Sequence, residues 1–166
     1  KFDSRDHIYF PTKGFFFDGN LTLYLDDSTK RFTEKHKFFY TVKSDLGYTF
    51  SLNKLLSISV GASLGALVNE PNRYSFSFLL GGYGNQNINN STPLIGYSAL
   101  DIFGFSFLKT TVGMDFSLSK NHYLRLKGNI ATVSDQPFDA HEWSEKRYSG
   151  YGVGYGINSF LGPIEL

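Results

Sequence analysis

Apolar and polar residues alternate with a period of two along most of the chain. From Phe38 to Leu52 every second residue is apolar except Ser44, whereas most residues between them are polar or small. Successive side chains of a β-strand point to opposite faces, so this pattern predicts a strand with one apolar and one polar face. At about 3.3 Å per residue such a strand spans roughly 50 Å, which is long for a soluble globular protein.

The same alternation predicts a series of strands joined by connections of alternating length. The predicted strands cover residues 2–10, 15–25, 37–50, 55–68, 105–118, 123–133 and 148–158, and another begins at 164. The short connections are 11–14, 51–54, 119–122 and 159–163, and the long ones are 26–37, 134–147 and the irregular segment 69–104. Short turns at one end and long loops at the other are typical of outer-membrane barrels, whose turns are periplasmic and whose loops are extracellular.

Strands with two different faces leave two architectures open. A soluble β-sandwich, which would be a binding module, covers its apolar faces with a second sheet. A membrane barrel turns them to lipid and keeps a polar lumen. Strand length and charges on the polar face favour an all-β, antiparallel transmembrane β-barrel. The residues predicted to face its lumen are Lys43, Asp45, Ser63, Asp115, Arg125 and Lys127.

Composition narrows the class further. The 166 residues include 16 Lys and Arg against 15 Asp and Glu, so no charge excess predicts nucleic acid as a partner. The absence of cysteine excludes disulfides, thiolate catalysis and Cys-ligated metals. Mean hydropathy is −0.22, and no stretch approaches the roughly 18 apolar residues of a membrane helix, which excludes a helical membrane protein.

The aromatic content and the chain ends carry two further expectations. Phe, Trp and Tyr make up 17% of the residues. Several lie near predicted strand ends, where rings form girdles at the membrane–water interface: Tyr9, Phe10, Phe15, Tyr48, Phe50, Tyr123 and Tyr148. The first residues lack the charged-then-apolar pattern of a signal peptide, and the strand that we expect to begin at Ile164 is cut short at Leu166. We therefore expect about eight strands of a longer polypeptide, because an unpaired strand edge is costly in lipid.

Two glycine-rich motifs suggest chemistry, yet both keep the alternation of a strand. Gly61-Ala62-Ser63-Leu64-Gly65 matches the G-x-S-x-G nucleophile elbow, which needs a strand, a sharp turn and a helix. Here the alternation runs unbroken through Ser63, so we predict a structural serine. The G-x-G-x-G-x-G run of residues 150–156 also alternates like a strand, which predicts close packing against an aromatic ring and not nucleotide binding.

The histidines offer no metal site by their spacing. They are His7, His36, His122 and His141. Asp139, His141, Glu142 and Glu145 are close enough in sequence to hold a divalent cation, but we interpret this segment as a solvated charged loop. We predict no catalytic, cofactor-binding or metal-binding residue in this chain, and no cofactor.

Three motifs, in order along the chain, resemble the BamA/TamA surface-antigen superfamily of outer-membrane barrels. Asp3-Ser4-Arg5-Asp6 with Pro11-Thr12-Lys13-Gly14 resembles its D-x-R-D…P-T-x-G hairpin. Gly81-Gly82 with Ile95-Gly96-Tyr97 resembles its G-G…R-G-[FY] loop, which folds back into the lumen. Tyr151-Gly152-Val153-Gly154 with Gly162-Pro163 resembles its penultimate hairpin. The resemblance implies a structural role for the motif residues Asp3, Arg5, Asp6, Pro11, Gly14, Gly81, Gly82, Ile95, Gly96, Tyr97, Gly162 and Pro163.

One departure decides between members of that superfamily. Ile95 stands where the loop arginine is expected, which argues against a protein-insertion or translocation barrel. The amino-acid sequence of residues 81–86 and 93–97 is more similar to that of barrels of Bacteroidota that follow a soluble, periplasmic patatin-type lipase domain. That resemblance implies that residues 1–166 form the C-terminal half of a 16-stranded barrel, with an extracellular loop at about 69–104. The segment itself would not be an enzyme, and a patatin-like phospholipase domain would lie outside it.

The same resemblance sets the expected place and partners. It implies the bacterial outer membrane, where the barrel anchors the lipase domain and forms a lumen for it. The partners would be the lipid bilayer with its lipopolysaccharide, the remaining strands of the barrel, and other outer-membrane proteins or a second copy.

Overall fold

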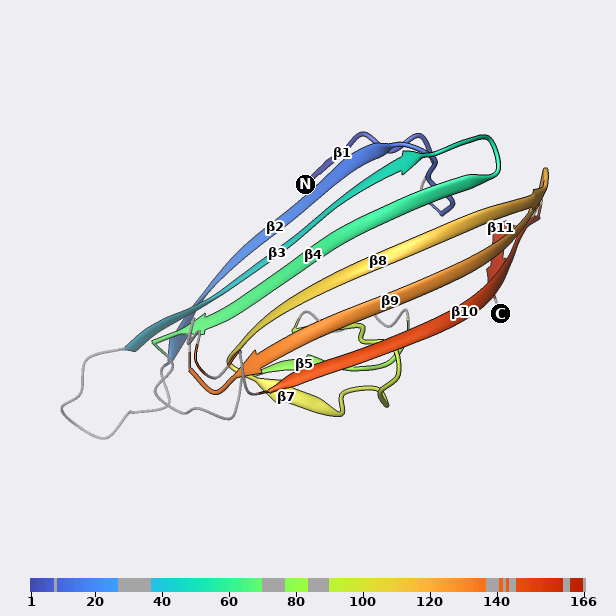
Figure 1. Cartoon of the computed structure of the whole chain (residues 1–166). Helices are drawn as coiled ribbons and strands as arrows, with labels where there is room; N and C mark the ends of the chain where they lie inside the picture. Colours follow the sequence, from blue (N-terminus) through green and yellow to red (C-terminus); the bar gives the residue numbers. More distant parts are fainter. Residues whose placement is uncertain are drawn as a thin grey trace.

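An eight-stranded antiparallel sheet dominates the computed structural model, which describes residues 1–7, 9–26, 37–69, 77–83, 90–136, 141, 143, 146–159 and 162–165. Its strands, in spatial order, are β1 (Phe2–Asp3), β2 (Gly14–Asp26), β3 (Lys37–Ser51), β4 (Leu56–Val68), β8 (Ser106–Ser119), β9 (His122–Ser134), β10 (Arg147–Ser159) and β11 (Gly162–Glu165). The sheet curves like half of a barrel (Figure 1). The predicted all-β, antiparallel fold class is confirmed.

The register of the sheet gathers the apolar positions on its convex face. Phe17 pairs with Leu46, and Val60 pairs with Val112. Paired residues of an antiparallel sheet project to the same face, so the alternation of each strand continues into the next. Leu23 and Val153 are exposed by 71% and 69%, and no second layer covers this face in the described residues. The sandwich alternative required such a layer, and a continuous exposed apolar surface marks a site of contact with a membrane or with another protein.

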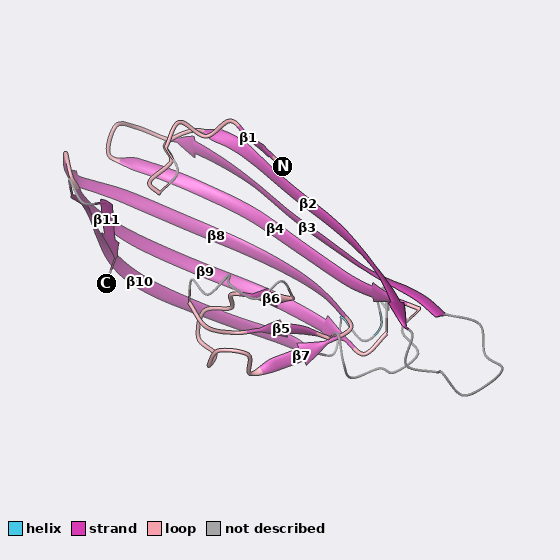
Figure 2. Cartoon of the chain, turned by 180° about the vertical axis from the view of Figure 1, so that it is seen from behind, coloured by secondary structure: helices cyan, strands magenta, loops and turns pink. Residues whose placement is uncertain are grey.

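A second, smaller sheet packs against the concave face. It consists of β6 (Ser91–Thr92), β5 (Phe78–Leu80) and β7 (Ile102–Gly104), and it lies beside β9 and β10 (Figure 2). The prediction of an irregular segment over 69–104 is therefore wrong for these residues. Strands of two or three residues carry too little alternation to be recognised in a sequence, because they form only against a larger surface.

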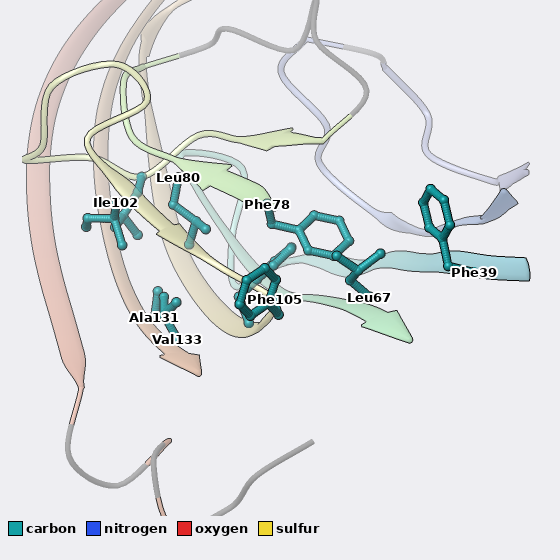
Figure 3. Close-up of a cluster of buried hydrophobic side chains, with 10 residues drawn as sticks. Phe39, Leu67, Phe78, Leu80, Ile102, Phe105, Ala131 and Val133 are labelled. Carbon is teal, nitrogen blue, oxygen red and sulfur yellow. The ribbon is translucent and has the colours of Figure 1, made fainter. Parts of the chain in front are cut away.

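Buried side chains of the small sheet supply the core between the two sheets. Phe78, Leu80 and Ile102 meet Leu67 and Val133 of the large sheet (Figure 3). The rings of Phe78 and Phe107 lie edge to face, with centroids 5.1 Å apart. The apolar core therefore lies on the concave side, at the end of the sheet where the long connections are.

The strand boundaries agree with the predicted ranges within a few residues, except at the N-terminus. The strand predicted over 2–10 is wrong, because β1 ends at Asp3. The side chains of Ser4 and Asp6 hydrogen-bond to backbone groups of the facing segment, which replaces ladder pairing with a wide turn.

The connections at residues 52–55 and 120–121 are short and share one end of the sheet, as predicted (Figure 1). Within the described residues, no helix has both the length and the apolar character needed to cross a membrane.

The predicted aromatic girdle is wrong for some of its members. Phe15 and Tyr48 are exposed on the convex face. Phe10, by contrast, is buried beneath the concave face and stacks on Tyr123, with ring centroids 4.2 Å apart. Tyr148 packs on the core at the other end. Strand ends hold aromatic residues on both faces, so position along a strand alone does not assign a ring to the interface.

A pair of arginine substitutions on β8 tests which face meets lipid. We expect Val112→Arg to destabilise the membrane-embedded protein by about 2–4 kcal/mol, because a charge on the lipid face near the midplane is costly. Thr111→Arg, one residue away on the cavity side, should have a much smaller effect. Denaturant unfolding of the full-length protein in lipid vesicles measures both. Equal losses at the two positions would contradict the membrane orientation.

Candidate functional site

The concave face of the large sheet lines a polar, partly open cavity of about 640 Å³. All six side chains predicted to face a lumen line this cavity: Lys43, Asp45, Ser63, Asp115, Arg125 and Lys127. They come from β3, β4, β8 and β9, which are neighbours in the sheet. The sheet therefore separates charge from apolar surface across its own thickness.

Arg125 is the centre of the charged network in this cavity. Its Nε and Nη2 donate to the two carboxylate oxygens of Asp115 at 2.6 and 2.9 Å. Its Nη1 donates to Glu165 at 3.1 and 3.2 Å, and Nη2 also donates to the carbonyl oxygen of Tyr9 at 2.9 Å. The bidentate geometry with Asp115 is the strong form of an arginine–carboxylate pair. One side chain thus joins β8, β9, β11 and the turn that precedes β2.

That turn runs along the concave face of the sheet and contacts β9 and β10. Arg125 lies over the ring of Phe10, 4.8 Å from its centroid. A Cβ at Gly156 would come within 2.7 Å of the same ring. The prediction that the glycine run of β10 admits a neighbouring aromatic ring is therefore confirmed at Gly156, because any larger residue there would displace Phe10.

The first sequence motif fixes this turn. Nε and Nη2 of Arg5 donate to the Asp3 carboxylate at 2.9 and 2.6 Å. The Asp6 carboxylate accepts hydrogen bonds from the backbone and the hydroxyl of Thr12 and from the backbone of Lys13. Burial by itself would raise the pKa of Asp6, but these hydrogen bonds lower it to about 2. Asp6 therefore accepts as a carboxylate throughout the neutral range.

Gly14 and Pro11 complete the turn at the start of β2. Gly14 has a φ of +124°, and a Cβ there would lie 2.6 Å from Cα of Arg5. Only glycine satisfies both the conformation and the close approach. Pro11 lines the cavity beside Tyr9. At the other end of the chain, Gly162 and Pro163 pair with Ser159 and Asn158 and begin β11.

The second motif positions the small sheet. Gly81, Gly82 and Gly96 have φ values of +135°, +75° and +92°, which favour glycine. Ile95 lies against β10, and the hydroxyl of Tyr97 donates to the carbonyl oxygen of Ser149 at 3.3 Å. Lys109 and Asn129 also contact this segment, and no sequence signal singled them out, because both lie in ordinary strand alternation.

Ser63 lies in the middle of β4, where it pairs with Asp45 on one side and Lys109 on the other. The strand continues without a turn through Ser63, as predicted, so the geometry of a nucleophile elbow is absent from this described strand.

In the described part of the chain, no group of three His, Cys, Asp or Glu side chains is placed to hold a metal ion. Asp139, Glu142 and Glu145 lie outside the described residues.

Replacement of Arg125 tests the charged network. We expect Arg125→Met to destabilise the protein by about 2–3 kcal/mol, because it leaves the carboxylates of Asp115 and Glu165 without their shared donor. The exposed Arg147 at the start of β10 provides a matched control, and Arg147→Met should cost less than about 0.5 kcal/mol. Thermal or denaturant unfolding of the full-length protein measures the difference. If the two variants unfold alike, the network does not stabilise the fold.

Comparison with known proteins agrees with this geometry. No curated protein matches the sequence closely enough to count as a relative. A family model described as the OMP85 superfamily matches residues 1–166. Proteins of this superfamily are bacterial outer-membrane proteins, and their barrel domains are not enzymes. With its curved antiparallel sheet, apolar outside and charged within, the chain belongs to the OMP85 superfamily.

Proposed function

We propose that residues 1–166 form part of the wall of a bacterial outer-membrane β-barrel that anchors a periplasmic, patatin-like lipase domain and provides its lumen. One observation carries the membrane part of this proposal. The convex face exposes large apolar side chains, whereas the concave face holds a cavity lined with charged residues. Lipid on one side and water on the other satisfy both faces at once.

The orientation of the barrel follows from its connections. In our proposal the end with short turns is periplasmic, and the end with long connections is extracellular and meets lipopolysaccharide. The loop at about 69–104 starts outside and folds into the lumen, where β5, β6 and β7 pack on the wall. The chain then contributes the C-terminal half of a 16-stranded barrel.

The two ends of the sheet are where the rest of the barrel would attach. β1 and β11 each pair with one neighbour in the sheet, so each has an edge that other strands can extend. Backbone groups in lipid need hydrogen-bond partners, which the remaining strands of the same polypeptide would supply. Other outer-membrane proteins or a second copy would then contact the completed barrel from outside.

The lipase part of the proposal rests on the loop. The segment around Gly81-Gly82 and Ile95-Gly96-Tyr97 is similar to that of patatin-linked barrels, and Ile95 replaces the arginine of the insertion barrels. The second candidate is a BamA/TamA-type barrel for protein insertion or translocation, which the superfamily match favours. Ser63 is structural in either case.

Full-length protein, expressed from the complete gene, distinguishes the two candidates. We expect outer-membrane fractions containing it to hydrolyse ester lipids, and Ser63→Ala to retain this activity, since the catalytic groups lie outside residues 1–166. The amount of the Ser63→Ala variant in the outer membrane also shows whether the barrel is intact, so that a loss of fold can be distinguished from a loss of activity. A protein without lipid hydrolysis, whose depletion lowers the amounts of other outer-membrane proteins, would instead identify the insertion barrel.

A further inference from the structure

An extended segment of the inward loop, residues 90–95, contains β6, the edge strand of the small sheet that faces the wall of the large sheet. One edge of this segment pairs with the backbone of the loop itself. The carbonyl oxygens of Asn90 and Thr92 accept from the backbone N–H groups of Leu79 and Gly81, at 2.9 and 3.1 Å. The N–H of Leu94 donates to the carbonyl oxygen of Gly82 at 3.0 Å.

The opposite edge pairs with side chains of the wall. Lys43 of β3 donates to the carbonyl oxygen of Ser91 at 2.8 Å, and Lys109 of β8 donates to that of Pro93 at 3.1 Å. Alternate residues of an extended chain direct their carbonyl groups to the same edge. Lysine side chains from two strands thus occupy positions that the N–H groups of a neighbouring strand would otherwise take.

Asn129 of β9 is the next wall residue after Lys43 and Lys109 to bind this edge, and its side chain reproduces both bonds of a β-bridge. Its Oδ1 accepts from the N–H of Ile95 at 2.8 Å, and its Nδ2 donates to the carbonyl oxygen of Ile95 at 3.3 Å. Nδ2 also donates to the carbonyl oxygen of Gly150 on β10, at 3.2 Å. A side-chain amide presents a donor and an acceptor on two separate atoms, as a backbone peptide group does.

The glycine at position 150 makes room for this contact. A Cβ at Gly150 would lie 1.7 Å from the carbonyl oxygen of Ile95, so even alanine would push the segment off the wall. A Cβ at Gly128, on the neighbouring strand, would meet only the carbonyl oxygen of Gly150 at 3.9 Å. The two glycines therefore differ in their relation to the segment, although they lie in the same strand pair.

Pro93, between Ser91 and Ile95, suits its position opposite Lys109 for a chemical reason. Proline has no backbone N–H, and the wall offers at this point the ammonium group of Lys109, which has no acceptor. A residue with an N–H there would direct a donor at a donor. The segment and the wall are therefore complementary in hydrogen-bond polarity at residues 93 and 95.

We propose that Lys43, Lys109 and Asn129 form a binding site for the carbonyl edge of an extended peptide, and that the chain's own segment Ser91–Ile95 is its resident ligand. The site recognises main-chain atoms, because each of these wall hydrogen bonds ends on a backbone atom of the segment. The loop is thus held inside the cavity without an arginine at position 95.

Thr92 provides a reporter for release of the segment. It is 1% exposed, and within the described residues its buried hydroxyl has no hydrogen-bond partner, so Thr92→Cys removes no such bond. Residues 1–166 contain no cysteine, and any cysteine elsewhere in the full-length protein is changed to serine. The rate at which a water-soluble maleimide labels Cys at this position, in purified protein in detergent, reports how often the segment leaves the wall.

The proposal makes opposite predictions for wall and segment substitutions. In the Thr92→Cys background, Asn129→Leu and Gly150→Ala should each raise the labelling rate by about tenfold or more. Ile95→Ala and the control Gly128→Ala should leave it within about twofold. Circular dichroism checks that each variant keeps its sheet, and Lys109→Met replaces any wall variant that fails this check. Release by Ile95→Ala to the same extent as by Asn129→Leu, or no release by folded wall variants, would overturn the proposal.

Discussion

The structure depends on a single constraint, the separation of apolar and polar side chains across one curved sheet. Along the middle of β2, β3, β4, β8, β9 and β10 the apolar residues point outward and the charged ones inward, and apolar residues such as Leu67, Phe107 and Val133 point inward only at the end that the small sheet covers. The in-register antiparallel pairing keeps this separation, because a shift by one residue would exchange the two faces of a strand. An apolar outer face suits lipid, and it leaves all polar chemistry to the concave side.

Charges confined to the concave side must then find partners there. Arg125 does so by joining Asp115, Glu165 and the backbone of Tyr9, which ties the turn before β2 to strands far from it in sequence. Lys43 and Lys109 do so by binding carbonyl groups of the inward loop. The wall charges therefore organise the two segments that fill the cavity, one from each end of the sheet.

The glycines of β10 show how the filling segments come close to the wall. Gly156 lies under the ring of Phe10, and Gly150 receives the carbonyl group of Ile95. Both belong to the glycine run of residues 150–156, which we interpreted from the sequence as a packing surface. The run predicted close approach correctly, but it did not indicate that an aromatic ring approaches one glycine and a peptide group the other.

The sequence by itself determined the strands, their two faces and the alternation of short and long connections, because these follow from a local period of two. It also placed Ser63 within a strand and the six charged or polar residues on the inner face. It failed where a segment has a short pattern, as for residues 2–10 and the three small strands. The tertiary structure alone decided which inner residues meet which loop. Asn129 and Ile95 are separated by 34 positions, and their contact depends on the curvature of the sheet, which no local pattern encodes.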